Sequence, residues 1–148
     1  MRKSIAVQFL LDVNVLVAMT LPDHPVHPKV HRWFQQTSDR RWATCPLTQG
    51  GFLRVATYLL GGSRQHMATA ITCLENCRLN PHHEFWPVDV DINDCDASLK
   101  GRILGPHQIT DLQLLLLAHK HRAQLATLDK GLGVLARGTQ YAKSLLVI

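Results

Sequence analysis

The stretch LLDVN, residues 10–14, decides the fold, because an apolar run that predicts a buried strand ends there in a carboxylate and an amide. The run starts at Ala6 and includes only one polar residue, Gln8, before Asp12. An ionised aspartate inside the same apolar interior is strongly unfavourable unless it is paired or metal-bound. We therefore place Asp12 at the open end of a sheet.

Length and composition predict one globular domain. The chain has 148 residues, of which 46% are hydrophobic. A domain of this size buries roughly two-thirds of the surface that its unfolded chain exposes, so we expect a single domain over residues 1–148. Its apolar segments are much shorter than the roughly 18 apolar residues of a membrane-spanning helix, and we expect no membrane association.

The first residues mimic a secretory signal, with a basic start (MRK, residues 1–3) followed by the apolar run. Asp12 and Asn14 interrupt that run where a cleavage site needs small neutral residues, so we expect a cytoplasmic protein. The four cysteines lack the dense spacing of a disulfide scaffold, and we expect reduced thiols in the core. They are Cys45, Cys73, Cys77 and Cys95.

The chain is basic, with 16 Lys and Arg against 11 Asp and Glu, a formal charge of +5 and a pI near 9.3. Such a charge favours a polyanionic partner by long-range attraction. Because many basic proteins bind no nucleic acid, the charge supports that interpretation only together with a site whose chemistry also needs phosphate.

Strand and helix patterns alternate along the chain, which predicts an α/β fold with a central parallel sheet covered by helices on both faces. Thr48 is expected to cap one helix, and Thr110 with Gln113 to form a capping box at the start of another that is apolar nearly all round. Expected strands are 6–11, 42–45, 85–88, 125–129 and 145–148; expected helices are 26–34, 48–60, 64–78, a short one ending near 104, and 110–118.

Three acids are expected to converge. Asp12 and Asp129 each end an apolar strand, and ligands of parallel sheets bind outside the carboxyl ends of the strands. Asp111 lies in the first turn of a buried helix, where the amide dipoles favour a negative charge. Taken singly, each acid also fits a turn or a helix start. Taken together, they predict a site for Mg²⁺, or alternatively Mn²⁺, which suits phosphodiester hydrolysis.

Four stretches occur in a fixed order: LDVNVL (11–16), PLTQGGFLRV (46–55), ITD (109–111) and ATLD (126–129). Together they resemble the ordered motifs of PIN-domain nucleases, and more narrowly those of the VapC toxins of bacterial type II toxin–antitoxin pairs. The resemblance implies a Mg²⁺-dependent endoribonuclease that acts on structured RNA, commonly tRNA or ribosomal RNA. It also implies a small antitoxin that fills the active-site groove, and we expect a homodimer.

The resemblance carries residue roles with it. Asp12, Asp111 and Asp129 match the catalytic and metal-binding acids, and Asn14 matches the polar position beside the first acid. The family's usual glutamate in the second stretch is absent. Gln49 is the preferred match and Gly51 the other possible one, so a neutral oxygen replaces a charged one. A fourth acid from elsewhere remains open, and the candidates are Asp89, Asp91, Asp94 and Asp96.

Two rival functions follow from these residues. A PIN-like module with a weakened site would hold RNA or a protein without cutting it. A phosphatase with Asp12 as nucleophile is disfavoured, because Asn14 stands where such enzymes usually have a second aspartate.

Several other side chains are candidates for contact with RNA. His107 precedes the third stretch, Arg54 lies in the helix of the second, and Thr127 either orients Asp129 or reaches the RNA. His24, His27 and His31 favour a solvated, RNA-facing surface over a zinc site. Two further groups have structural alternatives: Lys120, His121 and Arg122 form a helix cap or contact phosphate, and Trp33, Trp42 and Trp86 lie in the core or in dimer contacts.

Overall fold

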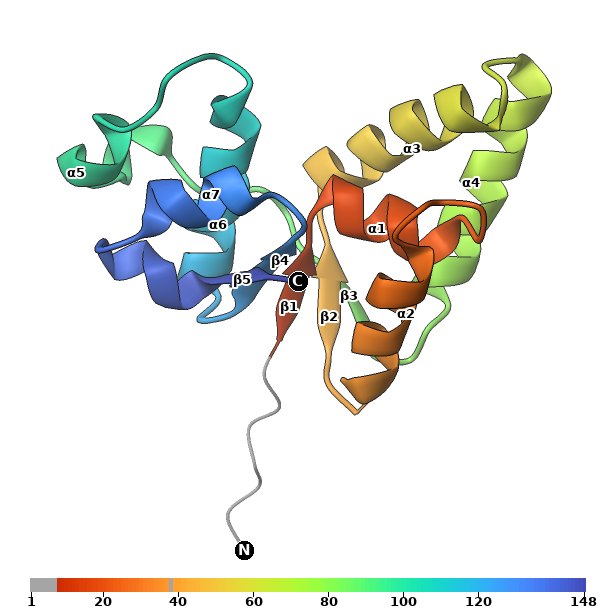
Figure 1. Ribbon diagram of the computed structural model, residues 1–148, viewed down its shortest axis with the longest axis horizontal. Coiled ribbons are helices and arrows are strands. Elements are labelled where there is room, and N and C mark those ends of the chain that lie inside the picture. The colour runs from red at the N-terminus through yellow and green to blue at the C-terminus, as the bar shows by residue number, and fades with distance from the viewer. Residues whose placement is uncertain (1–7, 38) are drawn as a thin grey trace, which may run out of the picture.

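The sheet has five parallel strands in the order β3-β2-β1-β4-β5 (Figure 1). The computed structural model describes residues 8–37 and 39–148, so the signal-like start and residues 6–7 of the first expected strand lie outside the described residues. The strands are β1 (Phe9–Leu11), β2 (Trp42–Thr44), β3 (His83–Phe85), β4 (Gln124–Thr127) and β5 (Leu145–Val147).

The strand order reverses between β1 and β4. The chain adds β2 and then β3 on one side of β1, and returns to place β4 and β5 on the other side. In an open parallel sheet, such a reversal leaves a crevice outside the carboxyl ends of the two central strands. Asp12 directly follows β1, and Asp129 follows β4 by two residues. The topology therefore brings both acids to the same crevice.

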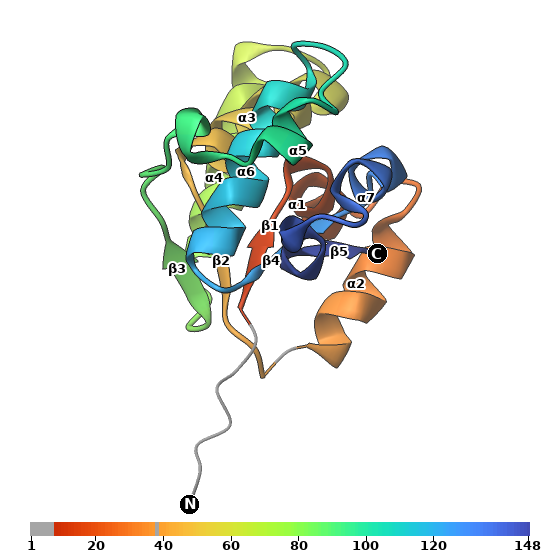
Figure 2. The same ribbon diagram turned by 90° about the vertical axis from the view of Figure 1, so that its left-hand side faces the viewer.

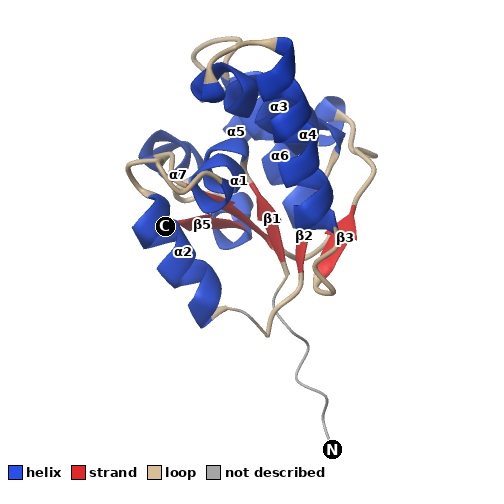
Figure 3. Cartoon of the chain, turned by 90° about the vertical axis from the view of Figure 1, so that its right-hand side faces the viewer, coloured by secondary structure: helices blue, strands red, loops and turns tan. Residues whose placement is uncertain are grey.

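Helices cover both faces of the sheet (Figures 2 and 3). Side chains of a strand alternate between faces, so Leu10 packs in a core with the leucine-rich helix while Phe9 and Leu11 pack in the opposite core. One face is covered by α1 (Val13–Thr20), α2 (His27–Gln36), α3 (Pro46–Leu60) and α4 (Arg64–Arg78); the other by α5 (Ala97–Lys100), α6 (Gln108–Lys120) and α7 (Lys130–Ala136), with the 3₁₀ turns η1 (Ile92–Asp94) and η2 (Gln140–Ser144). The predicted fold class is confirmed.

The leucine-rich helix is buried as predicted, because six of the residues of α6 lie in the core. The helix starts differ from the prediction. Thr48 is not the N-cap of α3: the helix begins at Pro46 after Cys45, and the Thr48 hydroxyl accepts the Cys45 amide at 2.9 Å from inside the first turn. A proline is well suited to the first helical position, since its missing N–H has no partner there.

The capping box expected at Thr110 is wrong as well. Helix α6 begins two residues earlier, at Gln108, whose side-chain oxygen accepts the Leu104 amide at 2.7 Å. The helix expected to run to Leu104 is also shorter, because α5 ends at Lys100. The start of α6 depends on this side-chain contact with the preceding loop, which helical spacing alone does not reveal.

The third strand lies two residues earlier than expected, at His83–Phe85, and occupies an edge of the sheet as the proline predicted. The Trp86 amide still donates to the Thr44 carbonyl at 2.9 Å. Pro87 has no N–H, so the ladder ends there.

All four cysteines are free, with Cys45 and Cys95 buried and the pair on α4 half-buried. Trp42 and Trp86 are buried and Trp33 packs partly buried against the core, so the tryptophans are core residues. Within residues 8–37 and 39–148, no helix combines the length and apolar character needed to cross a membrane.

Helices α1 and α3 pack so closely that only glycine fits at one position. A Cβ built on Gly51 would lie 2.5 Å from Cγ2 of Val13, whereas one on Gly50 would meet only the Arg54 guanidinium at 3.5 Å. We expect Gly51→Ala to lower the free energy of unfolding by about 1–3 kcal/mol, as overpacking does. Gly50→Ala is the matched control and should raise it by about 0.5–1 kcal/mol. Urea denaturation measures both, and equal effects would contradict this packing.

Candidate active site

The crevice between β1 and β4 is held together by backbone and side-chain hydrogen bonds. The Asp12 amide donates to the Ala126 carbonyl at 3.0 Å, which extends the pairing of the two strands to the first acid. The next residue of β4, Thr127, is fully buried beside it. Residues separated by 115 positions in the chain therefore meet at the end of two short strands.

Asp12 is a buried carboxylate with two donors. Its side chain is 6% exposed. One oxygen accepts the Val13 amide at 2.7 Å and so caps α1, and the other accepts the Thr127 hydroxyl at 2.7 Å. Burial raises the pKa of Asp12, the two hydrogen bonds oppose that rise, and the nearby charge of Asp129 adds to it. The two hydrogen bonds thus fix the direction of the carboxylate.

The Thr127 hydroxyl connects the polar residues of the crevice. It donates to Asp12, accepts the Asp129 amide at 3.1 Å, and receives the Asn14 side-chain amide at 3.4 Å. The Asn14 oxygen accepts the Leu128 amide at 3.1 Å. A hydroxyl has one donor and two acceptor positions, so that of Thr127 is saturated. This geometry favours an orienting role for Thr127 and Asn14 over direct contact with RNA.

Asp129 is exposed and caps α7. One of its oxygens accepts the Gly131 amide at 2.8 Å and the Leu132 amide at 3.4 Å. Its other oxygen makes no hydrogen bond with a described residue, and remains available to a ligand.

Asp111 projects from the first turns of α6 and is half-buried. Burial, and to a smaller extent the charges of Asp12 and Asp129, together raise its pKa from 3.8 to about 6. No hydrogen bond to a described residue offsets these effects. The three acids predicted from the sequence therefore lie close enough for their charges to interact.

The acids line a groove of about 280 Å³. Five residues that were not assigned to the site also line it. His24 comes from the loop before α2, and its ring Nδ1 accepts the Val26 amide at 3.3 Å. The sequence marked His24 only as one of three neighbouring histidines. The groove is lined by Asp12, Val13, Asn14, Val17, His24, Val55, Leu59, Asp111 and Asp129.

The acidic charge of the groove has no counter-ion among the described side chains. The ion pairs formed by described residues are Arg41–Glu84 and Lys120–Asp89, and neither lines the groove. Oxygen donors with an excess of negative charge are the ligands that Mg²⁺ prefers. In the described part of the chain, however, no three His, Cys, Asp or Glu side chains are close enough together to form a metal-holding group. The donor chemistry fits a hard cation, but the carboxylates are not gathered into a complete ligand set.

Gln49 does not line the groove. It lies in the first turns of α3, and its side-chain amide donates to the Thr44 hydroxyl at 2.9 Å, which in turn contacts His83 Nε2 at 2.7 Å. Gly51, the other possible match to the family's glutamate, packs on Val13. The structure therefore brings together Asp12, Asn14, Asp111 and Asp129 but not Gln49.

The four aspartates considered as a fourth acid lie elsewhere. Asp89 pairs with Lys120 at 2.8 Å, Asp91 caps η1, and Asp96 accepts the Gln140 amide. Neither these nor Asp94 lines the groove. Arg54 and His107 are exposed, on α3 and at the start of α6, and neither lines the groove either.

Known proteins resemble the chain over most of its length. It is 37% identical over 127 residues to the ribonuclease VapC44 of Mycobacterium tuberculosis, a match that covers 86% of this chain and 89% of VapC44. It is 40% identical over 129 residues to the ribonuclease VapC38 of the same organism, with the same coverage. The chain belongs to the VapC family of toxin–antitoxin ribonucleases. No protein-family model matches it.

Solved VapC structures have the same fold. The crystal structure of M. tuberculosis VapC20, a Sarcin-Ricin loop cleaving toxin, superposes with a TM-score of 0.60 at 11% identity and covers 85% of this chain and 93% of VapC20. VapBC2 from Rickettsia felis, bound to a DNA fragment from its promoter, superposes with a TM-score of 0.54 at 14% identity, covering 86% and 92%. The PIN fold predicted from the sequence is thereby confirmed for this VapC chain.

Thr127→Val tests the hydrogen-bond network of the crevice. Valine keeps the shape but leaves the Asp129 amide and the Asp12 carboxylate without their shared partner. Since an unsatisfied buried polar group is unfavourable by about 1–3 kcal/mol, we expect the free energy of unfolding to fall by that amount. Thr127→Ser keeps the hydroxyl and should lose less. Urea denaturation compares the three proteins, and a Val variant as stable as the wild type would contradict the assigned network.

The pH dependence of the stability of an Asp111→Asn variant tests whether burial and the neighbouring acids raise the pKa of Asp111. Because folding raises the pKa of Asp111 from 3.8 to about 6, the unfolded chain releases this proton first, and stability falls as pH rises through that range. Below pH 3.8 the group is protonated in both states and the penalty vanishes. We expect Asp111→Asn to raise Tm at pH 7.5 in EDTA, with a gain that shrinks toward pH 4. Asp94→Asn, an exposed acid outside the groove, is the control, and a pH-independent gain for Asp111→Asn would refute the explanation.

Proposed function

We propose that this VapC chain is an endoribonuclease toxin that hydrolyses phosphodiester bonds of RNA with Mg²⁺, or Mn²⁺, bound at Asp12, Asp111 and Asp129. One observation carries the proposal: three carboxylates line one groove, where the charges of Asp12 and Asp129 raise the pKa of Asp111 and no described cation pairs with them. Such an arrangement lowers the stability of the folded protein when no ligand is bound. It becomes favourable when a divalent cation and a phosphate complete it.

The donor set suits such a cation, since all three side chains offer carboxylate oxygens and Asp129 keeps one oxygen without a described partner. When bound, Mg²⁺ supplies Lewis-acid polarisation of the phosphoryl oxygen and lowers the pKa of a coordinated water. The chain's own residues supply direction and shape. Thr127 and the Val13 amide hold both oxygens of Asp12, and Asn14 ties the loop after β4 to α1.

The groove walls position the substrate. Asp111 and Asp129 flank Asp12 at the end of the sheet, and Val13, Val55 and Leu59 give the groove an apolar side. His24 lines the same groove, and because its Nδ1 accepts the Val26 amide, its Nε2 offers an N–H to a bound RNA. Because the anionic backbone of RNA is repelled by three bare carboxylates, this arrangement requires the cation before the substrate binds productively.

The RNA target is proposed as ribosomal RNA or tRNA. The likeness to VapC20, named a Sarcin-Ricin loop cleaving toxin, supports a ribosomal target. That likeness, at 11% identity, extends to the fold alone, so both target classes remain part of the proposal.

We further propose an antitoxin partner, a homodimer and a cytoplasmic location. The likeness to VapBC2 and the kinship with VapC ribonucleases support the antitoxin. The apolar side of the groove next to the acids suits a protein segment with apolar and basic side chains. Tyr58 on α3 is 79% exposed beside Leu59 at 52%, which gives a partner apolar surface to cover. Light scattering of the purified chain measures the dimer directly.

RNA cleavage with and without Mg²⁺ tests the proposed activity. We expect purified protein to cleave a structured RNA with Mg²⁺ and not in EDTA. An Asp12→Asn, Asp129→Asn double variant should lose at least about 100-fold in rate, because charge stabilisation at the reacting phosphate is removed. Mg²⁺ should also raise the Tm of the wild type and not of the double variant, a readout that is independent of turnover.

The rival function, a PIN-like module that binds without cutting, is favoured by one observation: Gln49 bonds to Thr44 and supplies no fourth acid to the groove. It predicts RNA binding by the wild type with a cleavage rate equal to that of the double variant. That result would replace the enzyme proposal.

A further inference from the structure

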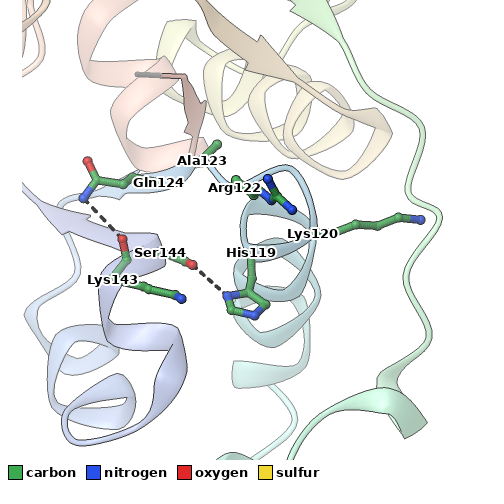
Figure 4. A pocket seen from close by; sticks show the side chains of 7 residues that line it. All are labelled: His119, Lys120, Arg122, Ala123, Gln124, Lys143 and Ser144. Atoms are coloured by element: carbon green, nitrogen blue, oxygen red, sulfur yellow. Dashed lines mark hydrogen bonds between the residues drawn. The ribbon is translucent and has the colours of Figure 1, made fainter. Parts of the chain in front are cut away.

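A second polar pocket lies at the amino end of β4, on the opposite side of the sheet from the acids at the carboxyl ends of the strands. Gln124 begins β4, whereas Asp129 follows the end of that strand, so the strand separates the two sites by roughly 15 Å at its rise of about 3.3 Å per residue. The pocket has a volume of about 410 Å³. It is lined by His119, Lys120, Arg122, Ala123, Gln124, Lys143 and Ser144 (Figure 4).

The pocket is rich in cationic side chains. Neither Arg122 nor Lys143 forms an ion pair with a described residue, and both are exposed. Lys120 points away from the other lining side chains (Figure 4), and it pairs with Asp89 at 2.8 Å. Among the described residues that line the pocket, none is Asp or Glu. Its net charge therefore favours an anionic ligand.

The floor of the pocket is polar and ordered. His119 Nδ1 contacts the buried Ser144 hydroxyl at 2.9 Å, and the Gln124 side-chain amide donates to the Lys143 carbonyl at 3.4 Å (Figure 4). The first contact holds the end of α6 against η2, and the second holds the start of β4 against η2. They fix the segments that carry the two unpaired cations.

Arg122 adopts a backbone conformation that glycine favours. Its φ is 54°, and it is the only described residue other than glycine with a positive φ. It follows the end of α6, where the Ala123 amide donates to the Ala118 carbonyl at 2.9 Å and the Arg122 amide to the His119 carbonyl at 3.1 Å. This is the Schellman ending of a helix, whose left-handed position is most often glycine. An arginine there is strained by about 1 kcal/mol.

The guanidinium is not needed to cap the helix. Backbone amides already satisfy the Ala118 and His119 carbonyls, and the Arg122 side chain makes no hydrogen bond with a described residue. The strain is therefore not compensated by a structural contact of that side chain. A ligand of the guanidinium would compensate it, and arginine is the residue best suited to bind phosphate oxygens.

We infer that Arg122 and Lys143 bind a backbone phosphate of the RNA substrate at this pocket, in addition to the phosphate cleaved at the acidic groove. The inference rests on the proposed ribonuclease function and deepens it, because it predicts a substrate that contacts both edges of the sheet. A folded RNA is large compared with roughly 15 Å, and its strands carry a phosphate every few ångströms. A folded RNA therefore reaches both sites at once.

RNA affinity and its salt dependence test the inference. A fluorescent RNA hairpin is titrated in EDTA, so that binding is measured without cleavage, with wild type, Arg122→Gly and Lys143→Ala. We expect each variant to bind about five- to tenfold more weakly, with the slope of log K against log salt reduced by about one. Arg122→Lys should keep part of the affinity.

Arg122→Gly separates binding from folding. Glycine relieves the positive φ, so the Tm of this variant should equal or exceed that of the wild type while RNA affinity falls. Arg64→Ala, which removes an exposed arginine at the start of α4, is the matched control and should bind the hairpin like the wild type. If Arg122→Gly were misfolded, Lys143→Ala would still decide the outcome.

Several results would overturn the inference. The first is an unchanged RNA affinity and salt slope in both pocket variants, and the second is an equal loss of affinity in Arg64→Ala. The third is weaker binding of polyglutamate by the pocket variants while their RNA binding is unchanged. That third result would assign the pocket to an acidic protein. The proposed function is tested separately, by RNA cleavage with Mg²⁺. If the wild type does not cleave RNA but Arg122→Gly weakens RNA binding, the inference about the pocket holds and the proposed nuclease activity is refuted. If the wild type cleaves RNA and the pocket variants bind RNA like the wild type, the nuclease activity holds and the inference about the pocket is refuted.

Discussion

The hydrogen bond between the Thr127 hydroxyl and the Asp12 carboxylate is the contact on which the crevice depends. A carboxylate that is 6% exposed needs donors, and this one receives the hydroxyl from β4 and the first amide of α1. The same hydroxyl accepts the Asp129 amide, so a single side chain orients one acid directly and the loop of another through its backbone. Short strands suffice because this network fixes their carboxyl ends.

Stability and activity oppose each other at this edge of the sheet. Asp111 is half-buried beside two other acids and has a pKa near 6, with burial and charge both acting against its ionised form. The large leucine core beneath α6 tolerates this penalty. Functional sites often violate local rules that the rest of a fold obeys. Here the violation supplies the negative charge that a divalent cation would neutralise.

The two edges of the sheet have opposite electrostatic character. Acids gather where β1 and β4 end, and cations gather where β4 begins. The parallel arrangement produces this separation, because all strand ends point to one edge and all strand starts to the other. The formal charge of +5 is therefore compatible with a strongly acidic groove. Each edge also contains a strained or unfavourable feature, Asp111 at one and Arg122 at the other.

Much of the fold was predictable from local patterns. Apolar runs ended by aspartate predicted that β1 and β4 finish at the site, and helical spacing predicted the leucine-rich helix; the structure agrees with both. Element boundaries were less predictable. We predicted the wrong starts for α3 and α6 and the wrong position for β3. A helix cap such as the Gln108 contact with Leu104 depends on how a loop folds back, which local patterns do not show.

The sequence by itself determined that Asp12 and Asp129 would meet, since the carboxyl ends of parallel strands lie together, and the family resemblance added Asp111 from the start of a helix. Only the tertiary structure decided what surrounds them. It brought His24, Val55 and Leu59 to the groove and directed Gln49 toward Thr44. The physical reason is separation along the chain: local spacing reports contacts within a few residues, whereas the Asp12–Thr127 contact spans 115 and requires the packed sheet to exist first.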